Sequence, residues 1–381
     1  MKSVYVDKAQ CSGCSACVQI CPKQCITMTA DSEGFLYPQI DEIKCIGCGL
    51  CQKACQAITP ITATQEPEAY AAYNVDENIR LHSSSGGVFT LLAEWIVGQG
   101  GTVFGAGYDE DFQVRHVAVN TIEDLEQLRG SKYVQSEIGS TYQQVEMLLR
   151  LGKIVLFTGT PCQIDGLLHY LRKPYPNLYT QDLICHGAPS PAVWKEYVKI
   201  REAKAASKTR RTFSRHKKYG WKMYSVFFEF SNNTEYIQIL KKDLYMQGFL
   251  ANLSLRPSCY SCHSKGAARN SDITLADFWG VDKILPEMFD DKGTSLVLVH
   301  TEKGREMLQA IRSQLVIKPV ELDEALKSNS AALHSVAVPE KREQFWKLYH
   351  QTGYSAAVKQ CCSNSLAKRF FRKLKSFIHY V

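Results

Sequence analysis

The sequence predicts a protein of mixed α+β and α/β class, with a small cysteine-rich domain, a larger α/β domain and a helical tail. Three observations support this prediction. A run of four cysteines occurs twice near the N-terminus, two strand–turn–helix units follow one another in mid-chain, and the last residues alternate apolar and basic positions at helical spacing. At 381 residues the chain is longer than one ordinary domain, so two or three are expected.

The N-terminal cysteines follow the spacing C-x2-C-x2-C-x3-C twice, starting at Cys11 and again at Cys45. Residues 1 to about 60 resemble bacterial two-cluster ferredoxins, in which each run gives its fourth cysteine to the other cluster. The resemblance implies two [4Fe–4S] clusters in a domain over residues 1–62. Their ligands form a first set, Cys11, Cys14, Cys17 and Cys55, and a second set, Cys45, Cys48, Cys51 and Cys21.

A disulfide framework and a pair of zinc sites are the alternatives for these cysteines. Disulfides are disfavoured because the sequence shows no signal peptide, and zinc sites prefer pairs of C-x2-C. Cys25 is a ninth cysteine, which we expect to pack beside a cluster; a labile extra thiol is the alternative. Gln56 stands at the position that Pro22 holds in the first run, and we expect it not to touch a ligand.

Composition favours a soluble, cytoplasmic protein in a reducing, low-oxygen cell. Hydrophobic residues make up 45% of the chain, and no apolar run reaches the roughly 18 residues that a membrane span needs. The net charge of +7 is concentrated in residues 199–218 and 366–375. Such basic segments suit acidic ferredoxins, phosphate-bearing substrates, anionic membranes or nucleic acid. We predict no nucleic-acid partner.

The middle of the chain predicts alternating strands and helices. Residues 63–82 have no periodicity and are expected to be a linker. A helix is expected over 88–97, strands over 100–107 and 113–119, a helical segment over 122–128, then strand 153–158, helix 163–171 and strand 178–184. Two strand–turn–helix units in succession predict neighbouring parallel strands. Cys162 and Cys185 then lie at the carboxyl ends of these strands, where α/β sheets build their sites.

Beyond the basic segment, strands are expected over 224–230 and 235–240 as a hairpin, followed by a helix over 244–253 and a strand over 295–300. The pair Cys259 and Cys262 lies between them and completes a third set, Cys162, Cys185, Cys259 and Cys262. A [4Fe–4S] cluster, a structural zinc and unligated thiols are all compatible with such a set. The residues alone do not decide between them.

From Ser83 to about Val299 the chain resembles the beta subunit of coenzyme F-420 hydrogenases and dehydrogenases. Six motifs in family order carry the resemblance: Ser85-Gly86-Gly87, Gly130-Ser131-Lys132-Tyr133, Thr160-Pro161-Cys162-Gln163, Asp182-Leu183-Ile184-Cys185-His186-Gly187, Cys259-x2-Cys262, and Asp272-Ile273-Thr274 through Asp277-Phe278-Trp279-Gly280. The resemblance implies FAD on an α/β domain that is not a Rossmann fold, over residues 83–360. It also implies one [4Fe–4S] cluster on the third set.

For FAD, the resemblance implies contacts from three segments. Ser84, Ser85, Gly86 and Gly87 at a helix start form the expected phosphate cradle, although a simply capped helix is the alternative. Ser131, Lys132 and Tyr133 are the expected flavin-side loop, and Thr160 and Gln163 complete the cofactor-binding residues. Lys132 could stabilise a reduced, anionic flavin by charge, and an ordinary surface lysine is the alternative.

Two further residues are candidates for catalysis together with Lys132. His186, beside Cys185, could tune the cluster or relay a proton, and a hydrogen-bonded structural histidine is the alternative. Asp277 could be a helix cap or a proton donor.

These predictions describe an iron–sulfur flavoprotein oxidoreductase. Ferredoxin, or a similar low-potential donor, would supply single electrons through the clusters to FAD, which would reduce an organic substrate by two electrons. Relatives act on deazaflavin coenzyme and tetrapyrroles, and many bacterial relatives are associated with surface-polysaccharide synthesis. The alternatives are a subunit that exchanges electrons between reduced coenzyme F-420, or another carrier, and a partner enzyme, and an electron-transfer adaptor without flavin. The oligomeric state stays open.

Residues 361–381 predict a basic amphipathic helix. From Leu366 onward, apolar residues share one arc and basic residues the other. This pattern is typical of a helix lying on anionic lipid at the inner face of a membrane, where a sugar or lipid-linked sugar could be the substrate. A terminal helix docked on its own domain is the alternative.

Overall fold

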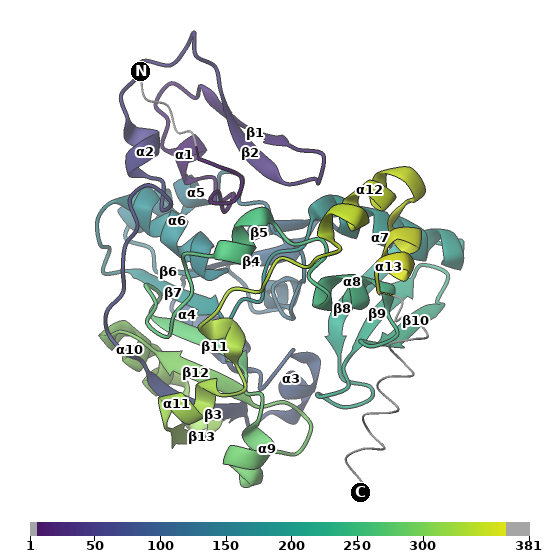
Figure 1. The fold of residues 1–381 in the computed structure, drawn as a ribbon. Coiled ribbons are helices and arrows are strands. Elements are labelled where there is room, and N and C mark those ends of the chain that lie inside the picture. The colour runs from purple at the N-terminus through teal and green to yellow at the C-terminus, as the bar shows by residue number, and fades with distance from the viewer. Residues whose placement is uncertain (1–5, 363–381) are drawn as a thin grey trace, which may run out of the picture.

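An eight-stranded mixed sheet forms the centre of the structure, a computed structural model that describes residues 6–362 (Figure 1). Its strand order is β13-β3-β12-β11-β7-β6-β4-β5. The strands are β3 (Glu68–Asn74), β4 (Thr102–Tyr108), β5 (Val114–Val119), β6 (Val155–Thr158), β7 (Leu178–Leu183), β11 (Ile273–Asp277), β12 (Ser295–Val299) and β13 (Leu315–Val320). Strands β4, β6, β7 and β11 are parallel neighbours, as predicted for β6 and β7.

Helices cover both faces of this sheet, which explains why β6 at its centre is buried at every position. Leu156 of β6 packs with α4 (Val88–Gly98) and α10 (Glu302–Ile311). Its neighbours Val155 and Phe157 face the opposite side, where they pack with α5 (Thr141–Arg150) and α6 (Pro161–Leu171). This alternation places α6, which begins beside Cys162, on the same face as the N-terminal domain.

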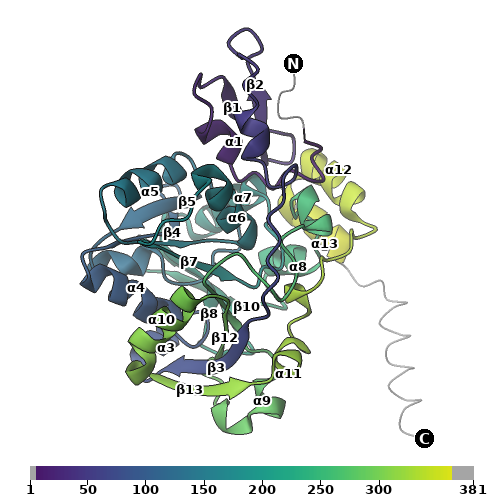
Figure 2. The same cartoon turned by 90° about the vertical axis from the view of Figure 1, so that its left-hand side faces the viewer.

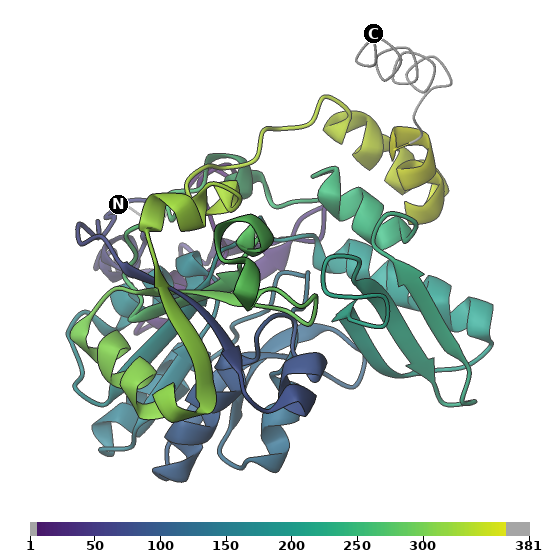
Figure 3. The same cartoon turned by 90° about the horizontal axis from the view of Figure 1, so that it is seen from below.

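A second, three-stranded antiparallel sheet lies to one side of the first (Figure 3). It consists of β8 (Thr209–His216), β9 (Ser225–Phe230) and β10 (Glu235–Ile239), and β9 and β10 form the hairpin that the sequence predicted. Helices α7 (Pro191–Ala205), α8 (Leu244–Leu250), α12 (Arg342–Thr352) and α13 (Tyr354–Cys362) accompany it. Trp194, Tyr197 and Phe228 form the aromatic centre of the core between these elements.

The cysteine-rich domain sits on α5 and α6 (Figures 1 and 2). It contains the antiparallel pair β1 (Ile26–Ala30) and β2 (Leu36–Ile40) and the one-turn helices α1 (Ala16–Gln19) and α2 (Leu50–Lys53). Each of these helices begins after a residue with left-handed backbone, Ser15 (φ 62°) or Gly49 (φ 72°). The tight turns bring the three closely spaced cysteines of each run to one side of the loop.

The linker predicted over 63–82 is wrong from residue 68 onward. Residues Glu68–Asn74 form β3, which pairs with β12 and β13, and Glu77–His82 form α3. Figure 3 shows β3 running beside β13 although they are far apart in sequence. The prediction failed because β3 is built largely of alanine and tyrosine, and its hydrogen-bonding partners lie more than half a chain away.

The basic segment 199–218 also contains a strand that the sequence did not predict, β8, which continues the hairpin into a three-stranded sheet. Most of the amphipathic tail predicted over 361–381 lies outside the described residues. Among residues 6–362, no helix has the length and apolar character needed to cross a membrane.

Candidate functional site

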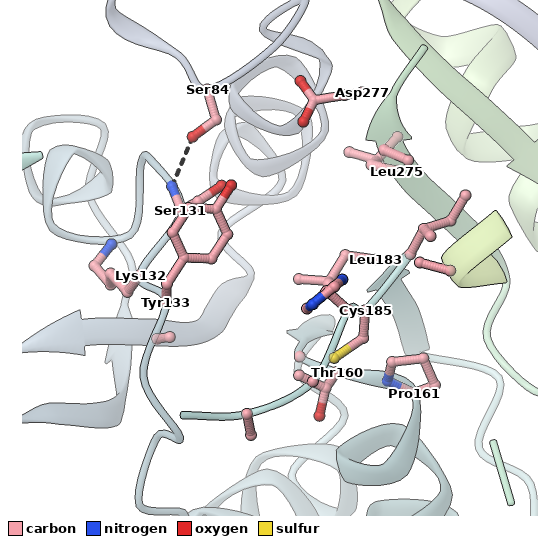
Figure 4. Close-up of a pocket in the computed structure, with 18 of the residues that line it drawn as sticks. Ser84, Ser131, Lys132, Tyr133, Thr160, Pro161, Leu183, Cys185, Leu275 and Asp277 are labelled. Atoms are coloured by element: carbon pink, nitrogen blue, oxygen red, sulfur yellow. Dashed lines mark hydrogen bonds between the residues drawn. The ribbon is translucent and has the colours of Figure 1, made fainter. Parts of the chain in front are cut away.

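A cavity of about 770 Å³ opens at the carboxyl ends of β6, β7 and β11 (Figure 4). Cavities of this size hold small molecules and cofactors. Its wall includes nearly all the residues for which the sequence predicted a role in the larger domain: Ser84, Ser85, Gly87, Ser131, Lys132, Tyr133, Thr160, Gln163, His186, Asp277 and the third set. Gly86 is absent from the wall. Segments that are far apart in sequence therefore meet at the carboxyl ends of these strands.

The start of α4 forms one side of the cavity. Gly87, with φ 82°, precedes the helix, and no side chain caps its first backbone N–H groups. Such a helix start attracts anions. Ser84 Oγ accepts a 2.7 Å hydrogen bond from the Ser131 backbone, which ties this turn to the opposite loop. Gly86 points to the sheet instead, because its N–H donates to Ser295 Oγ.

Lys132 is held by backbone carbonyls. Its Nζ donates to the oxygens of Leu128, Arg129 and Gly130 at 3.2–3.3 Å, and burial lowers the pKa of its ammonium to about 7. The Nζ atom also lies 5.5 Å from the centre of the Tyr108 ring. Lys132 thus braces the loop that carries Ser131 and Tyr133 and places at the cavity wall an amine that changes its protonation state near neutral pH.

The carboxylate of Asp277 is fully engaged by neighbouring side chains. It forms an ion pair with Arg215 (2.6 Å) and accepts a 2.7 Å hydrogen bond from Trp221 Nε1. Arg215 in turn donates to the Tyr133 hydroxyl and lies over the Tyr224 ring. This arrangement joins β11 to the second sheet, and it suits an anchoring role for Asp277 better than that of a proton donor.

His186, Thr160 and Gln163 occupy the opposite wall. His186 Nε2 lies 2.6 Å from Asn252 Oδ1, and burial lowers the pKa of the imidazole. Thr160 and Gln163 form a capping box at the start of α6. The Gln163 side chain accepts from the Thr160 backbone and donates to Ser136 Oγ, so both residues have a structural role at the helix start.

The third set gathers at this wall. Burial raises the pKa of the Cys162 thiol well above its ordinary value, and repulsion from Cys262, Cys185 and Cys259 raises it further. Burial likewise raises the pKa of Cys185 to about 11 and that of Cys259 to about 12. Four thiols at one wall are a donor set that fits a cationic iron–sulfur centre. Within residues 6–362, no three histidine, cysteine or acidic side chains converge tightly enough for a single metal ion.

The thiols of the first set lie near one another. Burial raises the pKa of Cys17 and Cys55, and the other thiols of the set add to the effect. The second set, by contrast, surrounds a small hollow at the outer end of the domain, where Cys48 is exposed. Cys25 lies at the same hollow, 3.4 Å from the Cys21 sulfur, so the prediction that it packs beside the second set fits the geometry.

The expectation that Gln56 touches no ligand was wrong. Its side-chain amide donates a 2.7 Å hydrogen bond to the Cys162 carbonyl oxygen and another of 2.9 Å to Ser12 Oγ. The error arose because Cys162 lies 106 residues away in sequence, and only the docking of the two domains brings it close.

Arg256 is a second residue that the sequence did not single out. Its side chain is buried between the domains, with Nε donating to the Cys11 carbonyl oxygen at 2.6 Å and Nη2 to that of Leu36 at 2.9 Å. The guanidinium lies 4.2 Å from the centre of the Tyr37 ring. In the sequence, its position three residues before Cys259 was the one feature that indicated a role near the cysteine sets.

Comparisons with known proteins agree with this division of the chain. Residues 152–325 match the family that describes the C terminus of the beta subunit in coenzyme F420 hydrogenase/dehydrogenase, and residues 10–57 match the 4Fe-4S dicluster domain. A protein of the F420-reducing [NiFe] hydrogenase complex from Methanosarcina barkeri, in a xenon-derivatised structure, is similar at 20% identity with a TM-score of 0.46, covering 70% of this chain and 91% of that one. No curated protein sequence matches.

The two family matches fall on the two parts that the structure separates: the cysteine-rich domain, and the α6–α11 region (α11, Leu322–Leu326) with the third set. The chain therefore carries an N-terminal 4Fe-4S dicluster domain followed by a domain similar to the C terminus of the beta subunit of coenzyme F420 hydrogenase/dehydrogenase.

Proposed function

We propose that the protein is an iron–sulfur flavoprotein that takes single electrons from ferredoxin, or a similar donor, and uses them for the two-electron reduction of an organic substrate. The main support for this proposal is the order of the three cysteine sets in space. The second set, with Cys48 exposed, lies at the outer end, the first set lies against α6, and the third set lies in the wall of the cavity.

The three cysteine sets would each hold a [4Fe–4S] cluster, and the cavity would hold FAD. Clusters of this kind carry one electron at a time, whereas a flavin accepts or gives two with protons. The contribution of the chain is to hold these groups in sequence. Gln56 and Arg256 fix the first domain on the second, and the loop of Ser131 to Tyr133 closes the cavity opposite the third set.

The cavity fits FAD in volume and in its polar groups. The uncapped start of α4 offers backbone N–H groups to a diphosphate, and the guanidinium of Arg215 and the amine of Lys132 lie at the wall. The Nε atom of Arg215 is buried and has no hydrogen-bond partner in the described part of the chain. These features support binding of an anionic cofactor beside the third set.

The outer surface of the first domain suits a protein donor. Ile43 is 98% exposed and Ile46 60% exposed, and both lie next to cysteines of the second set. Exposed apolar side chains beside a redox centre are favourable contacts for a transient partner. A role in surface-polysaccharide synthesis, a sugar or lipid-linked substrate, membrane contact and oligomerisation stay predictions.

Exchange of electrons with reduced coenzyme F420 for a partner enzyme is the second candidate, favoured by the family that residues 152–325 match. One anaerobic experiment separates the candidates. The purified protein, loaded with iron, sulfide and FAD, is mixed with reduced ferredoxin or with reduced coenzyme F420, and flavin absorbance is followed. Bleaching by ferredoxin alone supports the proposal, and bleaching by coenzyme F420 alone supports the second candidate. A protein that binds no flavin contradicts both and leaves an electron-transfer adaptor.

A further inference from the structure

The two cysteine runs differ at the residue that follows the fourth cysteine. The first run continues Cys21-Pro22, and the second continues Cys55-Gln56. Proline has no N–H group and no polar side chain, whereas glutamine has two amide donors and an acceptor. The repeat therefore places a hydrogen-bonding residue at one of two equivalent positions.

Pro22 and Gln56 lie in different surroundings in the structure. Pro22 lies at the hollow of the second set, at the outer end of the domain. Gln56 is buried, at 8% exposure, where the first set meets the second domain. Its amide donates to Ser12 Oγ, within the first run, and to the Cys162 carbonyl oxygen, within the third set. One side chain thus joins residues of two cysteine sets.

Helix α6 and the first cysteine set are in close contact near Gln56. A Cβ atom on Gly166, one turn after Cys162 in α6, would lie 2.8 Å from Cys14 Cβ and 3.0 Å from Cys14 Sγ. The backbone of α6 therefore approaches the first set directly, and the helix start that carries Cys162 is the part closest to Gln56. A hydrogen bond at this point fixes the rotation of Cys162 relative to Cys14 and Cys55.

We propose that Gln56 is a positioning residue that holds the first cysteine set against the third for one-electron exchange between the groups bound there. In this exchange the group on one set is oxidised by one electron and the group on the other is reduced by one, with no bond made or broken. The inference rests on the proposed function, because it requires a cluster on each set. Supporting residues of this kind commonly change activity about 10-fold to 100-fold when removed.

The test compares two glutamine-to-leucine variants of the full chain, both loaded without oxygen. Gln56→Leu removes the bridge. The control, Gln19→Leu, removes another buried glutamine of the same interface, whose side chain bonds the Gln143 backbone on α5 and no third-set residue. Iron content, the electron paramagnetic resonance spectrum of the reduced protein and the rate of electron transfer between clusters are measured. The expected result for Gln56→Leu is full iron, loss of the splitting caused by neighbouring clusters and about 10-fold slower transfer.

Three outcomes overturn the proposal. The first is an unchanged spectrum and rate in Gln56→Leu with full iron, and the second is an equal change in Gln19→Leu. The third is wild-type protein that binds no third cluster, which overturns the proposed function as well. If Gln56→Leu loses iron, Gln56→Met replaces it, since it keeps the length of the side chain and has no donor for the Cys162 carbonyl oxygen. A normal spectrum and rate in Gln56→Met then count against the proposal.

Discussion

The guanidinium of Arg256 donates a 2.6 Å hydrogen bond to the carbonyl oxygen of Cys11, across the boundary between the two domains. The same side chain donates to Gln135 Oε1, and a Cβ atom on Gly13 would lie 2.7 Å from its Nη1 atom. Gly13 also has φ 70°, so the first cysteine loop needs glycine both for its turn and for this contact. The buried guanidinium of Arg256, at the edge of the first set, therefore holds the two domains together.

Replacement of Arg256 should lower the stability of the folded protein. Arg256→Met leaves the carbonyl groups of Cys11 and Leu36 buried without a donor, and we expect the free energy of unfolding to fall by about 3 kcal/mol. Denaturant unfolding of the loaded protein measures the change. Arg305→Met is the matched control, because Arg305 pairs with Glu68 at the surface and should lose less than about 1 kcal/mol. Equal losses in the two variants would contradict this role for Arg256.

Removal of one ligand from the third set should remove one cluster and leave the others. Cys162→Ser is expected to lower the iron content from about 12 to about 8 atoms per chain, since each [4Fe–4S] cluster takes four cysteines. Iron analysis after anaerobic loading measures this. Cys362→Ser is the control, because Cys362 lies in α13 and contacts the Gln247 carbonyl oxygen. A full iron count in Cys162→Ser would exclude Cys162 as a ligand.

Local sequence patterns predicted most of the parallel sheet and the cysteine sets. The strand ending before Cys162 is mostly apolar, the strand ending before Cys185 starts with apolar residues, and the hairpin of β9 and β10 has an asparagine turn, so these elements were visible from neighbouring residues. The role of β3 was not visible, because its alanines become buried only when β12 and β13 pair with it. The roles of Gln56 and Arg256 were not predicted for the same reason. The residues that they contact are brought close by the docking of the two domains, and no local sequence pattern indicates that docking.

The exposed apolar residues beside the second set should matter for the donor and not for the fold. Ile43→Asp changes a side chain that is 98% exposed, so stability should be unchanged. We expect the concentration of reduced ferredoxin needed for half-maximal flavin reduction to rise roughly fivefold, which corresponds to about 1 kcal/mol. Ile122→Asp, at a 47% exposed position of the second domain, should leave this concentration unchanged. Equal effects of both substitutions would argue against docking at Ile43.

His116 should make the folded state less stable in acid. Burial lowers the pKa of its imidazole from 6.5 to about 4, where it contacts the Thr158 carbonyl oxygen and Ser136 Oγ. Between these two pH values the unfolded chain takes up a proton that the folded chain does not, so stability falls as pH falls, by up to about 3 kcal/mol. His116→Gln should flatten the difference in unfolding free energy between pH 7 and pH 5. An unchanged slope would show that His116 ionises normally in the fold.

The central claim is that three cysteine sets and one cavity hold three clusters and one flavin in a single chain. Its most direct test is the iron, sulfide and flavin content of the wild-type protein prepared and loaded without oxygen. The account predicts about 12 iron atoms and about one FAD per chain. A preparation that saturates at about 8 iron atoms, takes up zinc on the third set or stays free of flavin would contradict it.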